Sequence, residues 1–192
     1  DGIAKADIEN LNKRRAGNKA YTDDFLQQIY SLNSIAKFNE NFSFRNVSYL
    51  VLGKGYYEVF KQGQDYYSYN LDINNIYDDQ TELSITTDLL RRKWIENNYY
   101  GIVPMLTYSN SDIRFDIGGE FRAYKGDHFG EVTAFSDTQL SAQFSSNWHR
   151  YYQYLGKKNI LTGFARVLWS PTNQPFAVSI DLQNQNIHWD LN

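Results

Sequence analysis

Apolar and polar residues alternate along residues 113–126, IRFDIGGEFRAYKG. Odd positions carry Ile113, Phe115, Ile117 and Phe121, whereas the even positions between them carry mainly charged residues. Because successive side chains of a strand point to opposite faces, this period of two predicts a strand with one apolar and one charged face. The function of the chain therefore depends on what covers the apolar face.

We predict strands in five other segments, and the same period is visible in three of them, 22–38, 42–60 and 176–189. The five segments are residues 22–38, 42–60, 97–109, 158–170 and 176–189. Short sequences rich in Asn, Ser, Asp and Pro separate three consecutive pairs of strands, and such residues are typical of tight turns. The three predicted turns are 39–41, 110–112 and 170–175. The sequence thus predicts an all-β fold, an antiparallel meander of long strands.

Two longer polar segments, 61–96 and 128–157, join the opposite ends of the predicted strands. Within the first, Asp88 precedes LLRRKW, and Asp is a residue type that commonly begins helices, so we expect a helical turn near residues 88–94. Residues 1–20 are polar and are expected to form a loop or a frayed helix. The connections are therefore predicted to be short on one side of the sheet and long on the other.

The composition narrows the classes of protein to which the chain can belong. It has 192 residues, of which 42% are hydrophobic and 21% charged, and these fractions exclude a disordered chain. A net charge of −3 disfavours nucleic acid as a partner. The absence of cysteine excludes disulfide bonds and thiolate metal sites. Aromatic residues reach 17%, a level typical of strands, sugar-binding surfaces and the aromatic girdles of membrane barrels.

Two kinds of fold can accommodate strands that have one apolar and one charged face. In a soluble sandwich the apolar face packs inward, whereas in a transmembrane barrel it contacts lipid and the charged face lines a wet lumen. The long predicted strands and the asymmetric connections favour the barrel, because a membrane strand needs about 9–11 residues. Aromatic residues also gather at the predicted strand ends, as in a membrane interface. These aromatic residues are Tyr56, Tyr57, Tyr99, Tyr100, Tyr124 and Trp169.

Five segments, taken in order, resemble the barrel strands of TonB-dependent outer-membrane receptors, especially those of Bacteroidetes-like bacteria. The segments are GKGYYEVF at 53–60, TDLLRRKWIENNYYG at 87–101, GGEFRAYKGDHFGEV at 118–132, GKKNILTGFARVLW at 156–169 and AVSIDLQNQNIHW at 177–189. No single motif is specific to the family, but their order and spacing together are. Within the last segment, Asn-Gln-Asn stands where the family more usually has an aromatic residue and Arg.

The resemblance implies a 22-stranded barrel plugged by an N-terminal domain, in the outer membrane of a Gram-negative cell. Residues 1–192 then form a segment of the barrel wall, and outer-membrane lipid, the remaining strands, the plug domain and the periplasmic protein TonB are its partners. Such receptors import a scarce ligand such as a siderophore, cobalamin or a glycan. The alternative left open by the residues is a soluble, aromatic-rich β-sandwich or small barrel that binds glycan or lipid.

The sequence offers two sets of candidate binding residues. The charged row of the opening stretch is expected to face the lumen, where it contacts the plug or guides a polar ligand, or else forms a ladder of salt bridges. This lumen-facing row consists of Arg114, Asp116, Glu120 and Arg122. The long connections carry aromatic residues, which either bind the ligand or pack against each other. These loop candidates are Tyr66, Tyr67, Tyr69, Tyr77, Trp148, Tyr151 and Tyr152.

Residues with catalytic or metal-binding chemistry form no recognisable motif in this chain. His128, His149 and His188 lack the spacing of a metal site, and no nucleophile motif stands between a strand and a helix. Asp116 and Glu120 are too far apart along one strand for a retaining glycosidase. The basic sequence LRRKW is expected to be a solvated turn, or a contact with anionic lipid or ligand. We therefore predict no catalytic residues, no metal ligands, no cofactor and no enzymatic activity.

Overall fold

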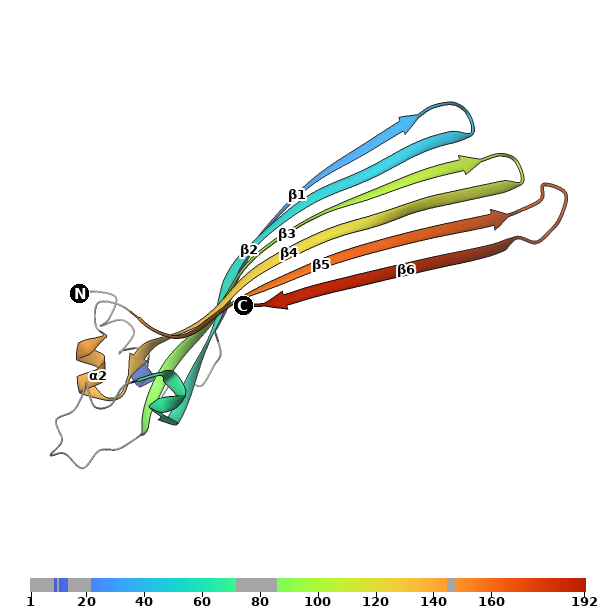
Figure 1. The fold of residues 1–192 in the computed structure, drawn as a ribbon. Coiled ribbons are helices and arrows are strands. Elements are labelled where there is room, and N and C mark those ends of the chain that lie inside the picture. Colours follow the sequence, from blue (N-terminus) through green and yellow to red (C-terminus); the bar gives the residue numbers. More distant parts are fainter. Residues whose placement is uncertain (1–8, 10, 14–21, 72–85, 145–147) are drawn as a thin grey trace. The chain divides into compact units, whose positions relative to one another are not determined.

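A computed structural model describes residues 9, 11–13, 22–71, 86–144 and 148–192. In these residues six strands form one sheet in the order β1-β2-β3-β4-β5-β6, so that each strand lies beside the next one in the chain (Figure 1). A short 3-10 helix, η1 (Tyr67–Tyr69), and helix α2 (Thr138–Gln143) lie in the connections. The strands are β1 (Thr22–Lys37), β2 (Phe42–Asp65), β3 (Thr86–Ser109), β4 (Ile113–Phe135), β5 (His149–Trp169) and β6 (Val178–Leu191).

This arrangement confirms the predicted all-β antiparallel meander, its six strands and its three short turns. β1 begins at residue 22 as predicted, whereas β2 to β6 are longer than predicted at the ends away from the turns, and β2 and β3 each have 24 residues. The helical turn expected near residues 88–94 is wrong, because β3 already begins at Thr86. Leu89 and Leu90 are both fully buried, and they pack in two different clusters. Neighbouring residues of a strand point to opposite faces, so a strand buries both leucines at once.

The chain divides into two compact units, and each of β1 to β5 contributes to both. Unit 1 comprises residues 1–26, 54–96 and 127–155, and unit 2 comprises residues 27–53, 97–126 and 156–192. The three short turns belong to unit 2, whereas the long connections belong to unit 1.

Unit 1 has a packed core built from the strand ends and the two short helices. Asp137 caps α2, because its Oδ1 accepts hydrogen bonds from the backbone N–H groups of Gln139 and Leu140 at 2.9 and 3.1 Å. The capped helix places Leu140, which is fully buried, in the main cluster. The buried members of that cluster are Tyr66, Tyr69, Leu71, Leu89, Val132, Phe135, Leu140 and Tyr151.

Unit 2 is a sheet in which asparagine side chains fix two of the three short turns. Asn39 Oδ1 accepts hydrogen bonds from the backbone N–H groups two and three residues further on, at 2.9 and 2.8 Å. Asn110 Oδ1 makes the same pair of contacts at 3.0 and 2.8 Å. The second and third turns are also linked, because Asp112 Oδ1 accepts from the N–H and the hydroxyl of Thr172 at 2.8 and 2.7 Å. The Asn residues that predicted the turns therefore form them directly.

One face of the unit 2 sheet is apolar and exposed. Ile113, Phe115, Ile117 and Phe121 of β4 keep 41%, 36%, 46% and 38% of their surface exposed. Within the described residues all six strands belong to one sheet, so no second sheet covers this face. We call it the apolar face. Its large exposed side chains are Tyr30, Leu32, Phe38, Phe42, Leu50, Tyr100, Ile102, Leu106, Ile113, Phe115, Ile117, Phe121, Leu161, Val167, Trp169, Val178, Ile180 and Leu182.

Candidate functional site

The opposite face of unit 2, which we call the polar face, carries the charged row predicted from the sequence. Arg114, Asp116, Glu120 and Arg122 are separated by even numbers of residues in β4, so they share this face. Arg114 Nε lies 2.9 Å from Asp116 Oδ2, and Arg122 Nη2 lies 2.5 Å from Glu120 Oε1. The row therefore forms salt bridges, which is one of the two roles expected from the sequence. The other role, contact with a lumen, stays a prediction.

Residues of neighbouring strands hold both carboxylates in place. The Thr107 hydroxyl of β3 donates a 2.6 Å hydrogen bond to Asp116 Oδ1, and Asp116 is only 5% exposed. From β2, the Tyr49 hydroxyl donates to Glu120 Oε1 at 3.1 Å and accepts from Arg122 Nε at 2.9 Å. Three strands thus contribute to one hydrogen-bonded surface, in which each carboxylate meets a guanidinium and a hydroxyl.

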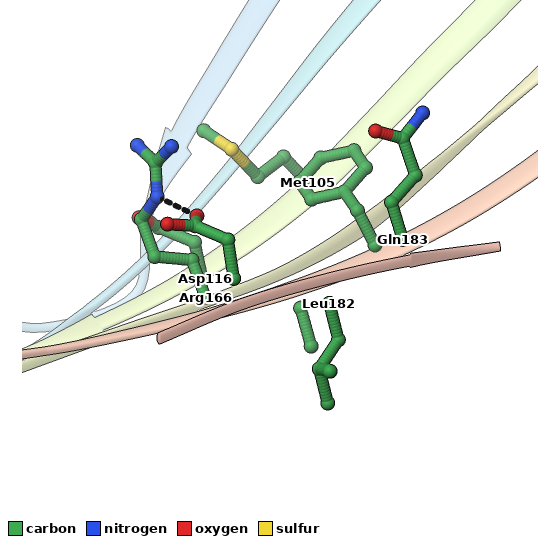
Figure 2. Close-up of a pocket in the computed structure, with 8 residues that line it drawn as sticks. Met105, Asp116, Arg166, Leu182 and Gln183 are labelled. Atoms are coloured by element: carbon green, nitrogen blue, oxygen red, sulfur yellow. Dashed lines mark hydrogen bonds and ion pairs between the residues drawn. The ribbon is translucent and has the colours of Figure 1, made fainter. Parts of the chain in front are cut away.

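A recess of about 290 Å³ opens on the polar face beside Asp116. Arg166 of β5 and Asp181 of β6 are direct partners in the register of the two strands, and their side chains form an ion pair. Figure 2 shows Gln183 on the side of the sheet where Met105 and the ion pair lie, whereas Leu182 points to the other side. The residues lining the recess are Met105, Asp116, Phe164, Ala165, Arg166, Asp181, Leu182 and Gln183.

Charges on this part of the polar face are balanced. Three arginines, Arg114, Arg122 and Arg166, pair with three carboxylates, those of Asp116, Glu120 and Asp181. Such a surface binds water and polar groups through many donors and acceptors without attracting one sign of charge.

Sequence reasoning missed Tyr49, Thr107, Arg166 and Asp181 as members of this surface. The last two carried a usable signal, because the turn at 170–175 fixes the register of β5 and β6 and places opposite charges directly across from each other. Tyr49 and Thr107 gave no such signal. Their contacts depend on how neighbouring strands align, which the sequence of one strand does not show.

The loop candidates of unit 1 occupy different environments. Tyr66, Tyr69 and Tyr151 are 1%, 2% and 8% exposed and belong to the core, which is the packing alternative considered for them. Tyr67 is 68% exposed and stays available for contact with a ligand. Trp148 lies 4.6 Å from the guanidinium of Arg92. Tyr152 is half-buried beside the core, and Tyr77 lies outside the described residues. Ligand binding by these residues stays a prediction.

Burial changes the acidity of the tyrosines in this core. It raises the pKa of Tyr69, of Tyr151 and of Tyr152, because a phenolate loses hydration inside the cluster. The Arg91 guanidinium donates a 2.9 Å hydrogen bond to the Tyr69 hydroxyl and counteracts part of this effect. These phenols therefore stay protonated well above neutral pH, and their rings act as packing groups of the core.

The basic sequence LRRKW is not the solvated turn expected from the sequence. It lies within β3, and Arg92 is largely buried, with its Nε 2.8 Å from Glu58 Oε2. The Arg92 guanidinium also lies 4.3 Å from the centre of the Tyr56 ring. Because its charge is neutralised inside unit 1, Arg92 has a structural role.

Two of the three histidines, His128 and His149, pack against an aromatic ring or the backbone, whereas His188 is exposed on β6. The His128 ring lies within β4 and stacks on Tyr154 at 4.9 Å, with an angle of 9° between the planes. The half-buried His149 Nε2 lies 2.6 Å from the carbonyl oxygen of Tyr69. In the part of the chain that the structure describes, no group of three or more His, Asp or Glu side chains is placed to hold a metal ion.

Comparison with known proteins leaves the family of the chain open. Over the residues that the structure describes, no helix is both long enough and apolar enough to cross a membrane. Neither the models of known protein families nor the sequences of curated proteins match this chain.

Proposed function

We propose that the chain is part of the wall of a TonB-dependent outer-membrane receptor, a barrel that imports a scarce ligand such as a siderophore, cobalamin or a glycan. The observation that carries this proposal is the exposed apolar face of unit 2, which backs a hydrogen-bonded polar face on the same strands. A membrane barrel has the same distribution, with apolar side chains toward lipid and polar side chains toward water.

Lipid is the occupant that best suits the apolar face. Soluble monomers rarely expose apolar patches larger than a few hundred Å², and this face carries large exposed side chains on all six strands. The segments of β3 and β4 in unit 2 have 13 and 14 residues, counted as 97–109 and 113–126. These lengths exceed the roughly 9–11 residues that a tilted membrane strand requires.

The two edges of the sheet require further strands if the sheet lies in a membrane. β1 and β6 are the two outer strands of the described sheet, so each leaves one row of backbone groups without a neighbouring strand. Unpaired backbone groups are too costly inside lipid, and a barrel removes them by closing the sheet. The remaining strands of the receptor would therefore pair with β1 and β6.

The polar face would line the lumen of this barrel. In its three ion pairs each arginine charge is balanced by a carboxylate. The hydroxyl of Tyr49 adds a group that both donates and accepts a hydrogen bond. Such a wall can contact a plug domain or a passing polar ligand without binding either strongly through net charge. No step of covalent chemistry is assigned to these residues.

The soluble sandwich requires a second sheet over the apolar face. Since the described strands form one sheet, another chain or another segment would have to supply that cover. Measuring what contacts Leu182 distinguishes the two proposals.

The chain contains no cysteine, so a single spin label can be placed at a chosen position. We would label Leu182→Cys and, as the matched control on the opposite face, Gln183→Cys, each as the sole cysteine of the full-length protein that the proposal requires, reconstituted in phosphatidylcholine vesicles. We expect the label at 182 to collide mainly with oxygen dissolved in the bilayer and the label at 183 mainly with a water-soluble nickel chelate. Equal access of the nickel chelate to both labels would rule out the lipid-facing assignment.

Import needs a separate test in cells. We would delete the gene from its host and measure uptake of ferric iron bound to siderophores, of cobalamin and of mixed oligosaccharides. Loss of one of these uptakes, restored by the wild-type gene, supports the proposed transport. Unchanged uptake of all three classes would contradict it.

A further inference from the structure

Apolar side chains change faces within the β5–β6 pair. Near the turn, Val167 and Ile180 are direct partners and belong to the apolar face. Seven residues further along each strand, Ile160 and Ile187 are direct partners. An odd number of residues separates the two pairs, so the isoleucine pair lies on the polar face. The apolar side chains of β6 therefore move to the polar face at the end of the pair away from the turn.

A second recess of unit 2, of about 310 Å³, lies where this change occurs. Tyr124, Ile187 and Trp189 supply its apolar surface, and Ile187 and Trp189 remain 49% and 69% exposed. The ring of Tyr99 lies 5.8 Å from that of Tyr124 and extends the aromatic surface. The complete lining is Tyr124, Gly156, Lys157, Lys158, Ile187, Trp189 and Asp190. An indole that is two-thirds exposed on a mostly polar face is a ready platform for a flat ring.

The two lysines beside the recess differ in their partners. Lys157 lies directly across from Asp190, whereas Lys158 lies directly across from Trp189. Alternation places Lys158 on the face of the recess and Lys157 on the other face. Among the described residues, Lys158 makes no ion pair and no side-chain hydrogen bond. Its ammonium is therefore an uncompensated positive charge next to an exposed indole.

We propose that this recess binds a ring that carries an anionic group, with the ring against Trp189 and the anion at Lys158. The proposal extends the proposed function, since the recess lies on the face assigned to the lumen. Aromatic side chains provide contact area at a low entropy cost, and one placed cation fixes the orientation of the ligand. Acidic sugars and aromatic acids share this chemistry, and the experiment separates these two sources.

Binding is measured on the full-length protein that contains this chain, in detergent micelles, by saturation-transfer NMR and titration. The acidic-sugar probe is trigalacturonate, compared with its neutral methyl ester, and the aromatic probe is salicylate, compared with salicylamide. We expect one of the two anions to bind and to be preferred over its neutral counterpart. Absence of binding by both anions would overturn the proposal.

Variants assign the binding to the recess. Trp189→Ala is expected to weaken binding about tenfold, the size of a lost ring-stacking contact. Lys158→Met should remove the preference for the anion while leaving the weaker binding of the neutral probe. Lys157→Met is the matched control on the other face and should change neither. Trp189→Phe keeps an aromatic ring and should retain most of the affinity, which shows that the variant sheet folds.

The result is read together with the spin-label measurement on Leu182 and Gln183. A label at Leu182 that contacts lipid, with no binding of either anion, would refute the recess and leave the barrel. Binding that depends on Trp189 and Lys158, with a water-exposed label at Leu182, would refute the barrel and leave the recess. Binding that is unchanged in both Trp189→Ala and Lys158→Met would refute the assignment of the site.

Discussion

Arg92 Nε lies 2.8 Å from Glu58 Oε2 inside unit 1, and only 17% and 2% of the two side chains is exposed. The partners come from β3 and β2, so this ion pair joins neighbouring strands in a place that water hardly reaches. A buried charge that loses such a contact loses part of what offsets its desolvation.

Replacing Arg92 by Ala should therefore destabilise unit 1 by about 3–5 kcal/mol, because it removes a 2.8 Å guanidinium contact from the buried Glu58 carboxylate. The free energy of unfolding is measured by urea titration of the refolded chain, followed by tryptophan fluorescence. The control is Lys54→Ala, which breaks an ion pair with Glu96 whose side chains are 61% and 42% exposed. This control should cost at most about 1 kcal/mol. Equal effects of the two substitutions would contradict the structural role of Arg92.

Gly101 leaves the space that the Tyr49 ring occupies on the polar face. A Cβ atom at position 101 would overlap the ring and hydroxyl of Tyr49. We expect Gly101→Ala to displace Tyr49 from Glu120 and Arg122, with a loss of about 1–3 kcal/mol in the free energy of unfolding. The cost should largely vanish when the same substitution is made in a Tyr49→Ala background. Additive effects in this double-mutant cycle would show that the two residues do not interact.

Asp112 fixes the contact between two turns, and this contact should depend on pH. Hydrogen bonds from Thr172 hold the pKa of Asp112 below its usual value of 3.8. Because the folded pKa is lower than the unfolded one, the contact is fully present above about pH 4 and is lost as the pH falls through the folded pKa. The amide resonance of Thr172 should therefore titrate with a midpoint below 3.8. A midpoint at or above that value, or no dependence on Asp112→Asn, would be inconsistent with this contact.

Alternation and turn residues predicted most of unit 2, because both are local signals. Asn39 and Asn110 form the predicted turns through their own side chains. The signal failed in unit 1, where Leu89 and Leu90 are buried on opposite faces and leave no period of two. Asp88 then resembled a helix cap, whereas its Oδ1 accepts a 2.8 Å hydrogen bond from the backbone of Gly63.

In the candidate site, the sequence predicts contacts within one strand but not contacts between strands. Periodicity placed Arg114 and Asp116 on one face, and their ion pair follows from positions two apart. Thr107 reaches Asp116 from the neighbouring strand, and the alignment of the two strands that decides this contact is a property of the folded sheet. Likewise, the recess beside Trp189 results from a change of faces along β6, where the apolar residues shift from even to odd positions.

A charged substitution on the apolar face tests most directly whether lipid covers that face. Ile117 is 46% exposed, so in water Ile117→Arg should change the free energy of unfolding by no more than about 0.5 kcal/mol. In lipid the same arginine should cost about 2–4 kcal/mol if the position lies near the middle of the bilayer. Gln183→Arg places the same side chain on the polar face and should cost little in either case. Urea titrations of the full-length protein in phosphatidylcholine vesicles measure both variants, and we expect a large loss for Ile117→Arg alone. If the two variants are equally stable, the apolar face does not contact hydrocarbon.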